Sequence, residues 1–279
     1  MRLIVISVLL SICVPALAQP WTELELAGSK LGIRLSVTAL LESVSQQQAH
    51  SQLADAQSPK PLMPSQPMSL LTLDSKALGK TYQQTILFEA DHLQTLQRKR
   101  VETGKKPRQR IARYTTTGIW DIRSEPKHKD QSVADWPLTS ENFLPFDREI
   151  DEPVSDASVL LVQLGQHDWA AEPQWSGYFY SRREVYLITA KVARSGQTRT
   201  DFQLHESSGS RRVKASRPSW KIEVNGSPIG KASAGAMEFL GMHGEIEIEL
   251  DQELKVPLTI SGKVKVAGTV TLKLKWVAP

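Results

Sequence analysis

Apolar and polar residues alternate along most of the chain, which is the pattern of strands with one buried face and one solvated face. Near the start, the alternation covers residues 23–26 and resumes over residues 31–37. Gly28-Ser29 lies between these two stretches, and small residues of this kind favour a turn. We therefore predict a β-hairpin that turns at Gly28-Ser29.

The middle of the chain has similar signals. Residues 81–88 are rich in β-branched and aromatic side chains and predict a strand. Residues 93–101 and 110–116 lie on either side of the polar segment Gly104–Pro107, which predicts a hairpin of two charged strands. A weaker strand is expected at 119–122, followed by a polar loop at 127–131.

The last third predicts an antiparallel meander. Residues 178–192 and 198–204 are expected to pair around Ser195-Gly196, and 219–224 is expected to end in a turn at Asn225-Gly226. Three glutamates alternate with apolar residues in 245–250, and lysines alternate with apolar residues in 263–266 and 270–275, on either side of Ala267-Gly268. If these strands are neighbours, we expect cross-strand Glu–Lys pairs, each worth roughly 0.2–1 kcal/mol.

Two segments break the alternation. Residues 43–67 are rich in Gln, Ser and Pro and are interpreted as a loop or extended linker, a flexible insertion between strands. Residues 155–165 predict a short helix, with Ser155 or Asp156 as its N-cap and Gly165 at its C-terminal cap. So short a helix is not stable alone and must pack on the sheet.

These elements predict a mainly β fold: one curved antiparallel sheet or open barrel with one short covering helix. Residues 19–279 are expected to form a single β-rich domain. The stretch before the 43–67 insertion is too short to build a core of its own.

The N-terminus has the layout of a secretory signal peptide. Arg2 is followed by an apolar run over residues 3–14, then Pro15 and the small-x-small sequence Ala16-Leu17-Ala18. We expect cleavage after Ala18 and a location in the periplasm. Two alternatives remain: an uncleaved anchor, and a lipoprotein acylated at Cys13, where Ile12 occupies a position that usually holds a small residue.

Cys13 is the only cysteine, so a chain cleaved after Ala18 has no thiol. This excludes disulfides, thiol catalysis and thiolate metal sites, and it favours a bacterial periplasm over a eukaryotic extracellular space.

No later apolar run is long enough to span a bilayer, so no transmembrane segment is expected after cleavage. The net charge of +4 is mildly basic and does not indicate nucleic-acid binding. Lipid head groups and other envelope components are the candidate partners.

No motif predicts catalysis, a metal or a cofactor. The six histidines lie far apart in sequence, and there is no HxH, HExxH, GxSxG or GxGxxG pattern. The acidic residues of 147–152 are interpreted as a solvated loop. A dispersed hydrolytic site around His167-Asp168 and Ser158 is the weakest alternative, and we expect the protein not to be an enzyme.

Two clusters are candidates for binding. The first is basic and lies in the 93–116 hairpin, where it could dock on an anionic surface or keep exposed strands from pairing with other chains. Its residues are Arg98, Lys99, Arg100, Lys105, Lys106 and Arg108. The second is aromatic and either lines a pocket for an apolar or sugar ligand or closes the core. Its residues are Trp169, Trp175, Tyr178 and Tyr180, with Phe179 between the two tyrosines.

From Leu93 to Trp276 the order of features resembles a family of exported bacterial proteins of unknown function. The resemblance rests on weak patterns: the basic hairpin, the strand at 119–122, the helix at 156–164, residues 184–192 and Leu254–Ile260. The chain departs from the family pattern in the 43–67 insertion and in Ala232–Phe239. The resemblance implies a periplasmic role and a curved antiparallel sheet, similar in architecture to lipoprotein-carrier half-barrels.

Together, these observations predict a non-enzymatic periplasmic protein that binds an apolar ligand or a cell-envelope component on a curved β-sheet. The alternative is a structural or scaffolding envelope protein that docks on anionic surfaces through the basic hairpin.

Overall fold

The computed structural model describes residues 19–55, 59–65, 68–77, 79–146, 150, 152–230, 235–265 and 267–279. The expected signal peptide, residues 1–18 with Cys13, lies outside them. The strands are β1 Glu23–Lys30, β2 Ile33–Val44, β3 Met68–Ala77, β4 Lys80–Glu89, β5 Thr95–Glu102, β6 Arg108–Tyr114, β7 Gly118–Ser124, β8 Leu138–Pro145, β9 Val154–Asp156, β10 Gln174–Ser181, β11 Glu184–Glu206, β12 Gly209–Pro228, β13 Glu238–Phe239, β14 Met242–Asp251, β15 Pro257–Val264 and β16 Gly268–Ala278. The helical elements are α1 Gln46–Gln52, α2 Leu160–Gln166 and the 3₁₀ turns η1 Val133–Asp135 and η2 Ala157–Val159. In this part of the chain, no helix is both long and apolar enough to cross a membrane.

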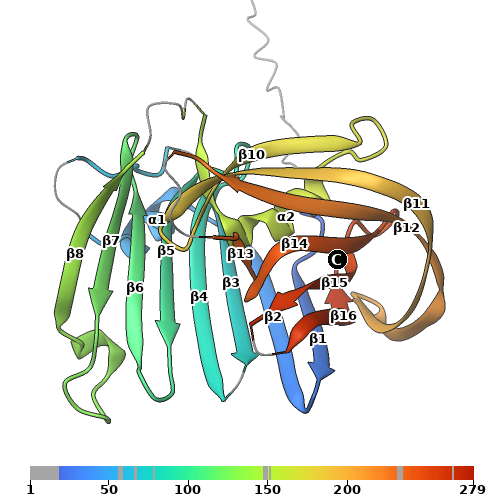
Figure 1. The fold of residues 1–279 in the computed structure, drawn as a ribbon, viewed down its shortest axis with the longest axis horizontal. Coiled ribbons are helices and arrows are strands. Elements are labelled where there is room, and N and C mark those ends of the chain that lie inside the picture. The colour runs from blue at the N-terminus through green and yellow to red at the C-terminus, as the bar shows by residue number, and fades with distance from the viewer. Residues whose placement is uncertain are drawn as a thin grey trace, which may run out of the picture.

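The strands form one sheet, which confirms the predicted fold class. Its order is β8-β7-β6-β5-β4-β3-β2-β1-β16-β15-β14-β12-β11-β10-β9, with β13 attached to β14. The first and last strands, β1 and β16, pair antiparallel in the middle of the sheet. Each half of the chain therefore builds one half of the sheet as a meander of sequence neighbours (Figure 1).

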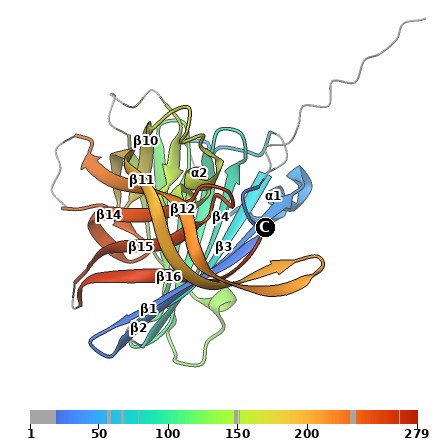
Figure 2. The same cartoon turned by 90° about the vertical axis from the view of Figure 1, so that its right-hand side faces the viewer.

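The sheet curls until its two halves face each other (Figure 2). The long β11–β12 hairpin arches over the C-terminal half, and β11 also pairs with β16 in parallel at Leu204 and Val277. At the far end of the C-terminal half of the sheet, the three-residue strand β9 contacts β5 of the N-terminal half. These contacts are made by side chains and not by backbone pairing of the two strands. The predicted open barrel is thus closed at this point by polar side chains.

The space between the two halves is filled by one apolar cluster, which we call the main core. It combines Trp21, just before β1, with side chains of β1–β4, of β10–β16 and of helix α2, such as Leu24, Phe88, Phe179 and Ile248. Burial on this scale contributes about 25 cal/mol per Å² of apolar surface and dominates the stability of such a fold. Helix α2 lies inside the curl as the expected covering helix, with Leu160, Leu161 and Leu164 buried.

The interpretation of residues 43–67 as a loop needs correction. Strand β2 continues to Val44, and Ser45 begins helix α1 with a capping box, in which its side chain accepts from the backbone of Gln48 while the Gln48 side chain accepts from the Ser45 backbone. Helix α1 covers the convex face of β3–β5, where Ala49 and Leu70 belong to a small second core. Residues 45–52 are thus the cap and the body of a helix, whereas the described residues 53–55 and 59–65 form no helix or strand apart from the single bridge between Pro61 and Thr115, as expected for a loop.

Three predicted turns are wrong. The first hairpin turns at Leu31-Gly32, where both residues have positive φ, 52° and 78°, as a two-residue type I′ turn requires. Gly28 is instead a strand residue whose missing side chain admits β16, since a Cβ there would lie 2.2 Å from the Thr271 carbonyl oxygen. Ser195-Gly196 and Asn225-Gly226 also lie inside long strands, β11 and β12, which turn at Ser207-Ser208.

Two further expectations change in detail. The predicted 155–165 helix begins as strand β9, continues as η2 and becomes α-helical only at Leu160. Asp156 is a cap as predicted, since its Oδ1 accepts from the Ser158 amide at 3.0 Å, but Gly165 lies within the helix. The Glu–Lys pair of strand β14 is made with β12 and not with the expected lysine strands: Lys221 Nζ of β12 lies 2.7 Å from Glu247 Oε1.

Candidate functional site

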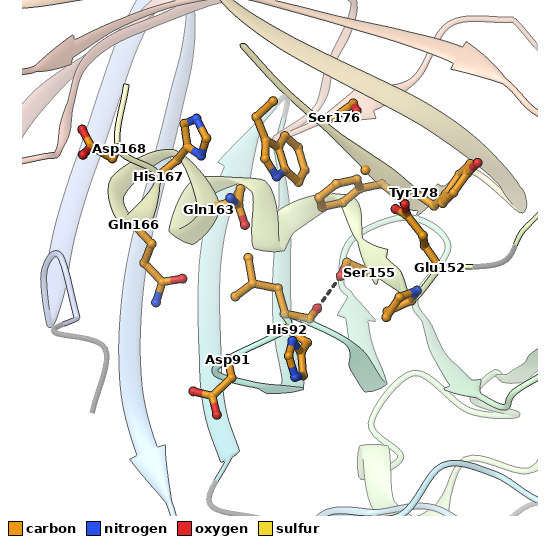
Figure 3. A pocket seen from close by; sticks show the side chains of 15 residues that line it. Asp91, His92, Glu152, Ser155, Gln163, Gln166, His167, Asp168, Ser176 and Tyr178 are labelled. Carbon is orange, nitrogen blue, oxygen red and sulfur yellow. Dashed lines mark hydrogen bonds between the residues drawn. The ribbon is translucent and has the colours of Figure 1, made fainter. Parts of the chain in front are cut away.

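A cleft of about 400 Å³ opens beside helix α2. Three segments far apart in sequence form it: the turn between β4 and β5, the segment leading into β9, and the stretch from α2 to β10 (Figure 3). The lining residues are Asp91, His92, Leu93, Glu152, Pro153, Ser155, Gln163, Gln166, His167, Asp168, Trp175, Ser176, Gly177, Tyr178 and Phe179. This is the size of a small-molecule site.

The position of α2 is set by a glycine contact. A Cβ on Gly165 would lie 2.7 Å from the Pro20 ring and 2.8 Å from the Lys255 carbonyl oxygen, so only glycine lets the helix approach this closely. The end of the helix is fixed by Trp169, whose indole Nε1 donates to the Leu164 carbonyl at 2.8 Å. With its apolar side held in the main core, α2 turns Gln163 and His167 toward the cleft (Figure 3).

Trp175 forms the aromatic part of the wall. It is half-buried, and its ring packs edge-on against Phe179 with the ring centroids 5.5 Å apart. A Cβ on Gly177 would lie 2.8 Å from this indole, so Gly177 leaves the room that the ring occupies along β10. Tyr178, also half-buried, lies at the Glu152 side of the cleft (Figure 3).

The remaining lining is polar and mostly exposed. Asp91 and Glu152 supply carboxylate acceptors at the rim, and Asp168 adds a negative charge, although its Oδ1 already accepts from the Ala170 and Ala171 amides. Gln163 and Gln166 each supply both donors and acceptors. An aromatic wall opposite such groups suits a ligand with apolar C–H faces and many hydroxyl groups. The carboxylates disfavour an anion here by Coulomb repulsion.

The structure divides the predicted aromatic cluster. Trp175 and Tyr178 line the cleft together. Trp169 lies in the main core beneath α2, and Tyr180 is buried against Tyr114 with the ring centroids 6.0 Å apart. Sequence reasoning did not find Asp91, His92, Glu152, Gln163 or Gln166 as lining residues. They carry no motif, and only the fold brings them together.

Below the cleft, three polar contacts, which we call the clasp, fasten β9 to β5 and to the turn that precedes β5. Arg98 Nη1 lies 2.9 Å from Asp156 Oδ2, the Asp156 amide donates to Thr95 Oγ1 at 2.8 Å, and the Ser155 hydroxyl donates to the Leu93 carbonyl. Burial alone lowers the pKa of Arg98, but the Asp156 carboxylate, with Tyr114 and Tyr180, raises it above its usual value, so the guanidinium stays charged. The clasp thus supports the floor of the cleft.

The six predicted docking residues do not form one exposed surface. Arg98 belongs to the clasp, and Arg108 pairs with the buried carboxylate of Glu102 at 2.5 Å. Arg100 is half-buried on the same side of the sheet, over the ring of Tyr82. The other three residues, Lys99, Lys105 and Lys106, are exposed.

The weak hydrolytic alternative involves residues with separate roles. His167 Nε2 is 2.8 Å from the Glu172 carbonyl oxygen, and its ring packs against Trp169. Ser158 is buried on η2, where its amide donates to Asp156. Among the residues that the structure describes, no group of three or more His, Cys, Asp or Glu side chains could hold a metal ion.

Comparison of the chain with protein-family models, with curated proteins and with solved structures found no match. The resemblance to exported bacterial proteins therefore remains a prediction.

Proposed function

We propose that the protein is a non-enzymatic periplasmic binding protein that holds a saccharide of the cell envelope in the cleft beside α2. The observation that carries the proposal is the half-buried indole of Trp175 facing a lining of amides and carboxylates. A pyranose ring offers an apolar face for stacking on an indole and a rim of hydroxyls for hydrogen bonds.

The cleft supports a polar ligand better than an apolar one. Side chains of the main core fill the space between β1–β4 and β10–β16, so the apolar part of the concave face is already covered. In the cleft, Asp91, Glu152 and Asp168 favour a neutral sugar over an acidic one. A neutral N-acetylated oligosaccharide, of the kind found in bacterial wall glycan, meets these conditions.

Isothermal titration of the mature protein with chitotriose tests the proposal. We expect saturable binding, weakened at least tenfold by Trp175→Ala, because tenfold corresponds to about 1.4 kcal/mol and the substitution removes the stacking surface. Trp136→Ala is the matched control: this half-buried indole lies in the loop after β7 and donates to the Gln131 carbonyl at 2.9 Å, away from the cleft lining.

Two results would contradict the proposal. One is the absence of binding to chitotriose or to a panel of neutral envelope oligosaccharides. The other is equal affinity in the wild type and in Trp175→Ala. Chromatography of the sugar after overnight incubation tests the non-enzymatic part: we expect it to stay intact, and cleavage that depends on Glu152 would instead assign a glycosidase.

A further inference from the structure

Three arginines lie directly opposite one another on neighbouring strands. Arg100 of β5 pairs in register with Arg110 of β6, and Arg110 pairs with Arg123 of β7. Side chains in such positions have Cβ atoms about 4.5–5.5 Å apart and point to the same face of the sheet. We call these residues the arginine row. Its face is the one that carries Arg98 of the clasp, two residues before Arg100 on β5.

Like charges directly opposite one another destabilise a sheet, so the row needs an explanation. The nearby carboxylates are largely occupied by other cations. Glu102 forms ion pairs with Lys80 and Arg108. Asp121 forms an ion pair with Arg183, whose Nη2 lies 2.6 Å from Asp121 Oδ2. Each of these buried acids is thus neutralised outside the row.

The row itself is poorly neutralised. Among the described residues, the ion pair of Arg100 is the long one to Glu238, 3.9 Å, beside its contact with the Tyr82 ring, and Arg123 pairs with Glu125 near the end of its strand. Within the described residues, Arg110 makes no ion pair, and its Nε is buried without a hydrogen-bond partner, as is that of Arg123. Burial, followed by repulsion from Arg108, Arg183 and Arg123, lowers the pKa of Arg110 below its usual value although Asp121 opposes this. A buried N–H without a partner is costly, so the row combines repulsion between like charges with unused hydrogen-bond donors.

We propose that the arginine row binds a phosphoryl group of a small soluble ligand, a site separate from the saccharide cleft. Planar guanidinium groups hold phosphate oxygens through paired hydrogen bonds, and three of them side by side offer more donors than one phosphoryl group needs. The side chains of Arg100 and Arg123 are only 29% and 33% exposed. Because the row is recessed in this way, a small molecule reaches it more readily than the plane of a membrane does.

Titration with inorganic pyrophosphate at low ionic strength tests the site. We expect one saturable site on the mature protein, weakened at least tenfold by Arg110→Gln and weakened by added salt. Arg199→Gln is the control, because Arg199 is an exposed arginine on β11, outside the row. In the absence of ligand, we expect Arg110→Gln to melt at the same temperature as the wild type or higher, since it removes repulsion. A purely structural arginine would instead lower the melting temperature.

Failure to bind pyrophosphate, or equal affinity in Arg110→Gln, would overturn the proposal. A second experiment, binding to phosphatidylglycerol vesicles, distinguishes a lipid head group from a soluble phosphate. If the protein instead bound phosphatidylglycerol vesicles, and this binding survived Arg110→Gln but was lost on substituting Lys99, Lys105 and Lys106 by Glu, the anion site would be the exposed hairpin and not the row. Chitotriose binding is expected to be unchanged in Arg110→Gln, so the two proposals fail independently.

Discussion

Replacing Asp156 by Asn removes the counter-charge of a buried guanidinium while leaving an oxygen to cap η2. The Asp156 side chain is 1% exposed and that of Arg98 is 14% exposed, so neither charge is well solvated. Removing one partner of such a pair typically costs about 3–5 kcal/mol, because the other charge stays buried without compensation. We expect Asp156→Asn to lower the free energy of unfolding by this amount.

Urea denaturation followed by tryptophan fluorescence measures the effect, with the slope of the transition used to check that the variant unfolds in one step. A double-mutant cycle with Arg98→Met isolates the pair. Because the second substitution removes the stranded charge, Arg98→Met/Asp156→Asn is expected to be more stable than Asp156→Asn alone. Asp201→Asn is the control, since Asp201 forms a bidentate pair with Arg212 on the exposed part of the β11–β12 hairpin, and we expect no measurable change.

A loss below about 1 kcal/mol for Asp156→Asn would refute this reasoning, because that is the range of an exposed ion pair. Additive effects of the two clasp substitutions would refute it as well. Either result would mean that the pairing of β9 with β10, and the packing of Val154 against Tyr114 and Tyr180 in one apolar cluster, hold β9 in place without the clasp.

Two other substitutions test separate parts of the account. Gly165→Ala places a methyl group 2.7 Å from Pro20 and should cost about 1–3 kcal/mol in a thermal melt, whereas Gly196→Ala, with nothing within 4 Å, should not destabilise the protein; equal effects would contradict the close approach of α2. His243 has its pKa lowered from 6.5, because burial outweighs the attraction of Glu238. The unfolded chain therefore takes up this proton at higher pH than the native state, so stability falls as the pH drops below about 6.5 through the folded pKa. His243→Gln should flatten this part of a stability–pH profile, and an unchanged slope would show that another group is responsible.

The alternation of apolar and polar residues predicted most strands, the 93–116 hairpin and the curved sheet, because strand periodicity is a local property. The positions of glycine residues predicted turns less well than the alternation predicted strands. Gly28 and Gly226 lie inside strands, where the missing side chain admits the Thr271 backbone and the Met237 side chain, and nothing local distinguishes this role from a turn. The α1 helix was missed although Ser45 and Gln48 have the spacing of a capping box, because so short a helix depends on packing against the second core, which the local sequence does not show.

The candidate sites could be predicted only in part. A dense aromatic stretch indicated Trp175 and Tyr178, since neighbours on one strand stay close in space. The polar lining of the cleft, and the clasp between Arg98 and Asp156, join residues that are far apart in sequence and become neighbours only when the sheet curls. For the same reason, a run of basic residues that reads as one patch is divided in the fold between a clasp, a recessed row and three exposed lysines.

The central claim, that the cleft beside α2 holds an envelope saccharide, is tested most directly by a crystal structure of the mature protein soaked with chitotriose. We predict a sugar ring stacked on the indole of Trp175, with hydroxyls within hydrogen-bond distance of Gln163 and of a rim carboxylate such as Glu152. Sugar bound elsewhere on the protein, with the cleft occupied only by water at saturating chitotriose, would contradict the claim.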